Sequence, residues 1–236
     1  MTDGVRINKY LAEQGLASRR EADVLIQAGV VRHNGIVATL GARVVPGDTV
    51  ELVGKTLHKQ YLAYYKGRGI ITHSPGPNEV DIASKLQADY GITDLYPVGR
   101  LDKDSEGLIL LTNDGRITRE LLAPEHAHER EYDVMVDKPV NDWFLRHMSA
   151  GVKIERYITK PAVVHASAKN PKRFAITLTE GKKHQIRRMC AALGYQVRTL
   201  KRVRIANIEL GKLKPNQYRN LQGAELAVFL KQLSIK

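Results

Sequence analysis

The sequence predicts an α+β protein in which a small N-terminal domain of helices and short strands precedes a larger domain built on an extended, mostly antiparallel sheet with flanking helices. The first observation is residues 4–53, where helical apolar spacing is followed by short apolar runs separated by turn residues. The second is a short linker at residues 54–60. The third is the mixed order of strand-like and helical segments beyond it, without repeats. We therefore place the domains at residues 1–56 and 61–236.

The N-terminal domain is expected to contain two helices followed by short strands. Apolar residues recur at helical spacing before Gly15. A capping box of Ser18 and Glu21 begins a second helix, which ends at Gly29. The Asn34-Gly35 pair predicts a hairpin turn. Strands are expected at residues 30–31, 36–37 and 49–53.

The larger domain is expected to alternate strands and helices. Strands are predicted at residues 61–65, 108–112, 130–136 and 174–179, and in parts of 197–210. Helices are predicted at residues 82–90, 117–122, 141–148, 184–193 and 224–233.

The charge of the chain points to a polyanionic partner. The formal net charge is +12, yet residues 1–53 hold six basic and six acidic residues, so the whole excess lies beyond them. Residues 181–208 contain eight basic residues and no acidic one. Such a run is usually a solvated face, but an acid-free stretch of this length favours a surface that contacts phosphates.

Cysteine content and hydropathy predict a soluble, cytoplasmic protein with no membrane partner. Cys190 is the only cysteine, which excludes a disulfide framework and a cysteine metal cluster. No run approaches the ~20 apolar residues that span a bilayer, and the N-terminus has no signal-peptide core. The pair His126 and His128 is too sparse to indicate a metal site, so no metal is expected.

Two arginines stand where local stability would not favour them. Arg19 and Arg20 lie in the first turn of the second predicted helix, where cations oppose the helix dipole unless a phosphate binds there. The whole segment from Arg6 to Leu52 resembles the small RNA-binding domain named after ribosomal protein S-four. The resemblance implies that this domain faces RNA with Arg6, Lys9, Arg19, Arg20, Arg32 and Asn34.

A polar turn precedes the apolar strand at residues 108–112. Asp102, Asp104 and Glu106 mimic the start of a calcium-binding EF-hand loop, but the twelfth position is Asn113 instead of glutamate. The preceding segment, which contains Pro97, cannot form the entering helix. Calcium is therefore excluded, and an ordinary turn before a buried strand is the alternative to a functional loop.

This turn, GRLDKDSEGLILLTNDG, resembles the catalytic signature of pseudouridine synthases of the RsuA family, and most closely that of RluF-like enzymes of the large ribosomal subunit. Further matching segments occur in the same order, including Glu131-Tyr132 and GKKHQIRRMC at residues 181–190, so the similarity covers nearly the whole chain. One departure is Lys66 to Gly69, where relatives usually carry Lys-Pro-x-Gly. Loss of the proline loosens this turn.

The resemblance implies a bacterial isomerase that converts uridine to pseudouridine with Asp102 as its catalytic carboxylate, acting as nucleophile or as base. The reaction needs no redox step and no transferred group, so no cofactor is expected. The resemblance assigns Arg187 to a salt bridge with Asp102 and Tyr132 to an aromatic platform for the extruded uracil. Helical spacing places Arg187 at the edge of a buried stripe and Arg188 on the outer face, where it can meet phosphate.

Ribosomal RNA is the expected partner, as a stem-loop of the large subunit or an assembly intermediate, and the protein is expected to be a monomer. Further candidates for RNA contact are Arg100, Lys183, Arg188, Arg198 and Lys201. Two alternatives stay open. One is the same reaction on small-subunit RNA, and the other is a non-catalytic RNA-binding or ribosome-assembly factor, which would not need Asp102, Tyr132 and Arg187 together.

Overall fold

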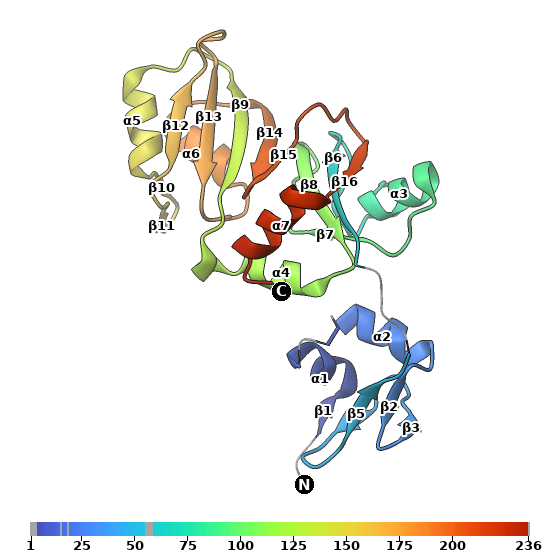
Figure 1. Cartoon of the computed structure of the whole chain (residues 1–236). Coiled ribbons are helices and arrows are strands. Elements are labelled where there is room, and N and C mark those ends of the chain that lie inside the picture. Colours follow the sequence, from blue (N-terminus) through green and yellow to red (C-terminus); the bar gives the residue numbers. More distant parts are fainter. Residues whose placement is uncertain (1–3, 15, 18, 55–58, 236) are drawn as a thin grey trace.

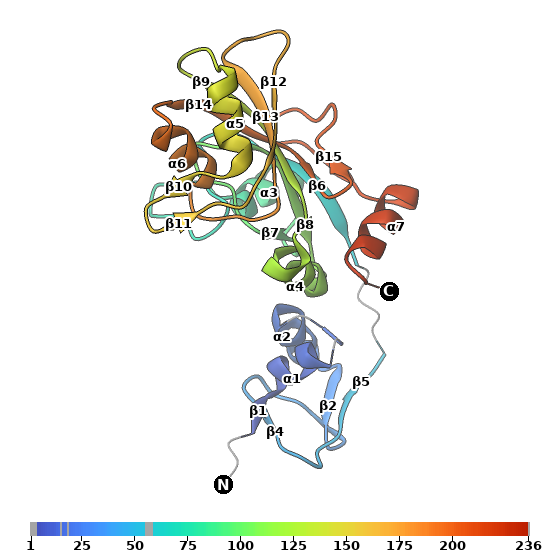
Figure 2. The ribbon, with the colours of Figure 1, turned by 90° about the vertical axis from the view of Figure 1, so that its left-hand side faces the viewer.

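The computed structural model describes residues 4–14, 16–17, 19–54 and 59–235. A small N-terminal part lies beside a larger part that contains one long sheet with helices packed against it (Figures 1 and 2). This arrangement confirms the predicted α+β class. Within the described ranges no helix has the length and apolar character needed to cross a bilayer.

The N-terminal part contains two helices packed over short strands. Its core is formed by apolar side chains that include Ile7, Leu11, Leu25 and Ile26. In chain order the elements are β1 (Val5–Arg6), α1 (Ile7–Glu13), α2 (Arg19–Gln27), β2 (Val31–His33), β3 (Ile36–Val37), β4 (Arg43–Val44) and β5 (Val50–Leu52). Strands β1 and β4 were not predicted, because two-residue strands carry no periodicity. The predicted Gly15 helix end and Ser18 cap lie outside the described residues.

The larger part is built on nine strands, with the order β12-β13-β9-β14-β8-β6-β16 and with β15 and β7 paired to β14 and β8. Pairing is antiparallel except between β14 and β8. The strands are β6 (Tyr61–Lys66), β7 (Tyr96–Val98), β8 (Glu106–Thr112), β9 (Arg130–Val136), β12 (Val163–Ala166), β13 (Arg173–Leu178), β14 (Val197–Ile205), β15 (Ile208–Glu209) and β16 (Tyr218–Asn220); a separate hairpin holds β10 (Lys153–Ile154) and β11 (Tyr157–Ile158).

Helices cover the sheet on both faces near β6 and β8. The helices are α3 (Ile82–Tyr90), α4 (Gly115–Leu122), α5 (Asp142–Ala150), α6 (Gln185–Ala192) and α7 (Gly223–Gln232). Helix α3 packs on one side through Ile82, and α4 and α7 on the other through Ile117 and Phe229. Helices α5 and α6 share a core with β13, β9 and β14. Side-chain caps explain where α3, α4 and α5 begin: Asp81, Asp114 and Asn141 accept backbone N–H bonds.

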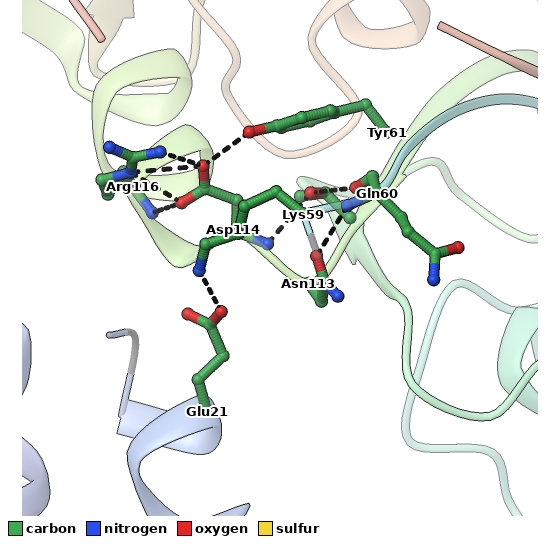
Figure 3. Close-up of polar contacts among 8 residues, drawn as sticks. Glu21, Lys59, Gln60, Tyr61, Asn113, Asp114 and Arg116 are labelled. Carbon is green, nitrogen blue, oxygen red and sulfur yellow. Dashed lines mark hydrogen bonds and ion pairs between the residues drawn. The ribbon is translucent and has the colours of Figure 1, made fainter. Parts of the chain in front are cut away.

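The end of the linker is tied to both parts of the molecule (Figure 3). Lys59 forms an ion pair with the buried Glu21 of α2. The backbone of Gln60 is held by Asn113 Oδ1 at 2.9 Å and by Thr112 Oγ1 at 2.6 Å. Next to them, Tyr61 donates to Asp114, which also pairs with Arg116 at 2.7 Å. A polar cluster at the N-terminal end of α4 therefore surrounds the beginning of β6.

Candidate active site

A cleft with a volume of about 720 Å³ lies over one face of β13, β9 and β14. Residues that pair across neighbouring strands point to the same face of a sheet. Tyr132 of β9 pairs with Ile176 on one side and with Arg202 on the other. The side chains that the three strands contribute to the floor of the cleft are Arg130, Tyr132, Leu178, Leu200 and Arg202.

Two loops from distant parts of the sequence form the walls. One is the segment of residues 98–102, which ends at Asp102, and the other is the turn of residues 179–186 that leads into α6. The structure therefore brings Asp102, Tyr132 and the beginning of α6 to one cleft. Arg187, one residue further along α6, does not line it in the described structure.

The loop that carries Asp102 is anchored by a buried threonine. Thr72 Oγ1 donates to the carbonyl of Leu101 at 2.8 Å and accepts from the backbone N–H of the same residue at 3.0 Å. The backbone N–H of Ser105 closes the turn on the carbonyl of Asp102 at 3.0 Å, and Gly69 N–H donates to the Lys103 carbonyl at 2.8 Å. These bonds hold the backbone on both sides of the carboxylate, so Asp102 is presented from a fixed loop.

The carboxylate of Asp102 is only partly covered, with 38% of its side chain exposed, and lies 3.4 Å from His184 Nε2. His184 has a left-handed backbone (φ 53°) at the N-cap of α6. The predicted salt bridge between Asp102 and Arg187 is not formed among the described residues. Arg187 Nη2 donates instead to the carbonyl of Asp104 at 3.2 Å and to Ser105 Oγ at 3.3 Å. The guanidinium thus braces the turn that follows Asp102, because α6 runs past this turn.

A glycine sets how closely this turn approaches β14. Gly107 has a φ of +109°, and a Cβ added there would lie 2.3 Å from the carbonyl oxygen of Arg202. Gly107 and Arg202 are partners in the parallel pairing of β8 with β14. Only glycine allows this approach, which places the turn after Asp102 directly beside the floor of the cleft.

Two protein-family models match the chain. A model for RNA pseudouridylate synthase matches residues 60–192, and a model for the S4 domain matches residues 5–50. The first match alone covers more than half of the chain. This protein belongs to the RNA pseudouridine synthases.

Relatives of this synthase extend the similarity to both parts of the chain. The dual-specificity RNA pseudouridine synthase RluF of Escherichia coli (strain K12) is 41% identical over 228 residues, which cover 94% of this chain and 77% of that protein. The ribosomal large subunit pseudouridine synthase B of Bacillus subtilis (strain 168) is 34% identical, over 94% of this chain and 93% of that protein. A crystal structure of a pseudouridylate synthase superposes with a TM-score of 0.69 at 29% identity, covering 97% of this chain and 99% of that one.

Among the predicted RNA contacts of the synthase domain, Arg100 and Lys183 line the cleft. Arg188 pairs with Glu155 at 2.9 Å, and Arg198 is exposed. Lys201 is half-buried, with its ammonium 5.8 Å from the ring centre of Tyr65. Two of these five positions, Arg188 and Lys201, therefore already have a partner within the protein.

The predicted contacts of the S4 domain divide in a similar way. Arg6, Lys9, Arg19 and Arg20 are exposed, and Lys9 pairs with Glu13 at 3.5 Å. The guanidinium of Arg20 also lies 4.9 Å from the ring centre of Tyr96, in the synthase domain. In the hairpin, Arg32 donates to the Gly35 carbonyl at 3.0 Å and Asn34 Nδ2 donates to Asp48 at 2.8 Å.

Several residues of the site were not predicted. Lys66 is fully buried and donates to the carbonyls of Gly67 and Ile70. Burial lowers the pKa of Lys66 to about 8, against the opposite effect of Asp102. The other members that the sequence did not single out are Thr72, Arg130, His184 and Arg202. His184 and Arg202 lie within the basic run at residues 181–208, but the sequence did not indicate that they line the cleft.

Proposed function

We propose that this synthase converts one specific uridine of large-subunit ribosomal RNA to pseudouridine, with Asp102 as the catalytic carboxylate. The observation that carries the proposal is Asp102 on an anchored loop, above a cleft whose floor presents Tyr132. The similarity to the ribosomal large subunit pseudouridine synthase B of Bacillus subtilis supports the large-subunit substrate. We further propose domain limits at residues 1–56 and 61–236, a cytoplasmic location and a monomeric state.

The reaction begins with extrusion of the target nucleotide from its stack into the cleft. The carboxylate of Asp102 then either attacks C1′ of the ribose or removes the proton from C2′. In both routes the C1′–N1 bond breaks and its electron pair leaves with the base. The base turns and C5 bonds to C1′, while the ester bond from Asp102 to C1′ breaks in the first route or the proton returns to C2′ in the second. The C5 proton is then lost while N1 gains one. Substrate and product are isomers, so the sequence of steps balances without a co-reactant.

Tyr132 and Arg187 are proposed to support these steps differently. The ring of Tyr132 supplies an aromatic face on the cleft floor against which the uracil can lie while it turns. Arg187 holds the turn of Asp104 and Ser105 and so positions the loop that carries Asp102. Arg100 and Lys183, at the rim of the cleft, are proposed to bind the RNA backbone.

The proposal is tested by tritium release from ribosomal RNA labelled at C5 of uridine, combined with mapping of pseudouridines in RNA from a strain that lacks the gene. Release of tritium and loss of one large-subunit pseudouridine are the expected results. Loss of a small-subunit pseudouridine instead would overturn the proposed substrate. RNA binding without tritium release would overturn the enzyme assignment of Asp102.

A further inference from the structure

Among the described residues, two arginines on the floor of the cleft form hydrogen bonds with backbone carbonyls and with no side chain. Arg202 is 4% exposed, and it donates to the Leu108 carbonyl at 2.7 Å and to the Arg100 carbonyl at 3.5 Å. Arg130 donates to the carbonyls of Leu121 at 2.8 Å and His128 at 3.3 Å. In the described chain no carboxylate forms an ion pair with either guanidinium. By contrast, Arg204, two residues further along β14, pairs with Glu131 at 2.9 Å and Glu129 at 3.0 Å.

The two guanidiniums flank Tyr132 on the same face of the sheet. Arg130 precedes Tyr132 by two residues on β9, and Arg202 is the cross-strand partner of Tyr132 on β14. Burial lowers the pKa of Arg130, and the charge of Arg202 lowers it further. Arginine nevertheless stays protonated in proteins. The floor beside Tyr132 therefore carries two like charges in a partly desolvated place.

Two further nitrogen atoms in this part of the cleft form no hydrogen bond in the described structure. Arg202 Nη2 and His128 Nε2 are both buried without a hydrogen-bond partner, and both residues line the cleft. Burial lowers the pKa of His128 and so favours its neutral imidazole. Buried cations without a counter-ion are unfavourable in the free protein. Such an arrangement becomes favourable when an anion occupies the cleft.

The proposed reaction generates an anion inside the cleft. When the C1′–N1 bond breaks, the uracil leaves with both electrons of the bond, and its negative charge spreads over N1, O2 and O4. We propose that Arg202, together with Arg130, stabilises this detached uracil anion and so lowers the barrier to cleavage of the ribose–base bond. The inference rests on the proposed reaction at Asp102. Arg202 acts as a positioning and electrostatic residue, because it lies beside Tyr132 on the floor of the cleft while its Nη1 holds the Arg100 carbonyl.

The test compares uridine with 5-fluorouridine in ribosomal RNA transcripts under single-turnover conditions. Fluorine withdraws electrons and makes the base anion intrinsically more stable, so an enzyme that lacks the stabilising charge should gain most from it. Arg202→Met should lower the rate with uridine by about 100-fold, and with 5-fluorouridine by roughly 10-fold or less. Rates are followed as loss of the starting nucleoside by chromatography after nuclease digestion.

Two variants separate charge from fold. Arg202→Lys keeps the charge and should stay within about 10-fold of the wild type. Arg204→Met removes the ion-paired arginine of the same strand and should slow both substrates by the same small factor. A misfolded fraction also slows both substrates equally, so the ratio of the two penalties is insensitive to folding.

The inference is overturned if Arg202→Met slows uridine and 5-fluorouridine by the same factor. It is also overturned if the variant binds RNA more weakly at an unchanged single-turnover rate, because Arg202 would then bind a phosphate. If the wild-type protein modifies small-subunit RNA, only the proposed substrate is contradicted. The inference about Arg202 is still tested, because the ratio of the two rate penalties is measured on whichever RNA the wild type converts. Full activity of Asp102→Asn would contradict the proposed site independently of this ratio.

Discussion

Two acidic residues of one turn have different surroundings. Asp102 lines the cleft and lies 3.4 Å from His184, whereas Asp104 is exposed and lies outside the cleft lining. The sequence motif contains both carboxylates, and its family resemblance indicated the first. Of these two carboxylates, the structure places only Asp102 in the cleft that Tyr132 also lines.

Asp102→Asn should abolish turnover and leave the melting temperature and RNA affinity nearly unchanged, because a partly exposed amide of the same shape replaces the carboxylate. Tritium release under saturating RNA, with a thermal melt of each variant, measures both effects. Asp104→Asn is the matched control and should keep substantial activity. Measurable turnover by the Asp102 variant would refute its catalytic role.

Arg187 and Arg188 are neighbours on α6 with different partners. Arg187→Ala should lower the turnover number and destabilise the fold by about 1–2 kcal/mol, because the Asp104 carbonyl and Ser105 hydroxyl lose a charged donor. Arg188→Ala should chiefly raise the Michaelis constant. It should hardly change the stability of the fold, because the ion pair of Arg188 with the exposed Glu155 contributes under about 1 kcal/mol. Steady-state kinetics and chemical denaturation distinguish the two. Equal, mild effects would show that Arg187 does not position the turn.

At the scale of elements, the Asn34-Gly35 hairpin depends on one carboxylate. Asp48 accepts from Asn34 Nδ2 and from the Val45 N–H at 2.8 Å each, and lies 2.8 Å from His33 Nε2. The hydrogen bond from Asn34, followed by those from Val45 and His33, lowers the pKa of Asp48 from 3.8 to about 2. The Asn34-Gly35 motif thus predicts the two-residue loop of the hairpin, but it does not predict that Asp48 holds this loop through hydrogen bonds.

The lowered pKa of Asp48 means that the folded state favours the ionised form. Its contribution to stability is therefore present above pH 3.8 and is lost as the pH falls toward about 2. Asp48→Asn should flatten the dependence of unfolding free energy on pH in this window and leave its slope near pH 7 unchanged. Denaturation series at several pH values measure this. An unaltered acid limb in the variant would contradict the assigned cause.

The pairing of β8 with β14 requires Gly107. Gly107→Ala should destabilise the protein by roughly 2–4 kcal/mol and reduce turnover, since its Cβ would overlap the Arg202 carbonyl. Gly91→Ala is the control: its φ is +70°, yet its Cβ would meet nothing within 4 Å, so only about 1 kcal/mol of backbone strain is expected. Thermal and chemical denaturation compare the two. Equal losses would show that the approach to Arg202 does not matter.

At the scale of the whole molecule, the junction between the S4 and synthase domains uses residues that were predicted to bind RNA. Arg20 lies over the ring of Tyr96, and its neighbour Glu21 pairs with Lys59 of the linker (Figure 3). Both Arg19 and Arg20 are exposed, but within the described residues only Arg20 of this pair lies over a ring of the synthase domain.

Arg19→Ala should raise the Michaelis constant and reduce the salt dependence of RNA binding by about one phosphate contact, with little change in turnover number. Arg20→Ala and Tyr96→Leu should have similar effects on RNA affinity, and the double variant should be no worse than either alone. Binding over a salt series and saturation kinetics measure these quantities. Additive effects of Arg20 and Tyr96 would show that Arg20 binds RNA directly.

Local patterns predicted much of the fold. The bounds of β9 and α3 agree with the predicted segments, because both carry a full apolar period between turn or capping residues. The strands β7, β10, β11, β12 and β16 were missed, since each is only two to four residues long and therefore too short to show an apolar period. The parallel pairing of β14 with β8 was also missed, because no residue pattern distinguishes it from an antiparallel pairing of the same strands.

The sequence by itself determined the α+β class, the family, the motif carboxylate Asp102 and the aromatic Tyr132, because each is encoded in contiguous residues. Only the tertiary structure decided which groups meet: that Asp102 lies within ion-pair distance of His184 and not of Arg187, and that Arg202 lies beside Tyr132 with no ion pair among the described residues. These contacts join residues about 70 to 80 positions apart. They are set by the register of the sheet and the path of two loops over it, and local sequence carries neither.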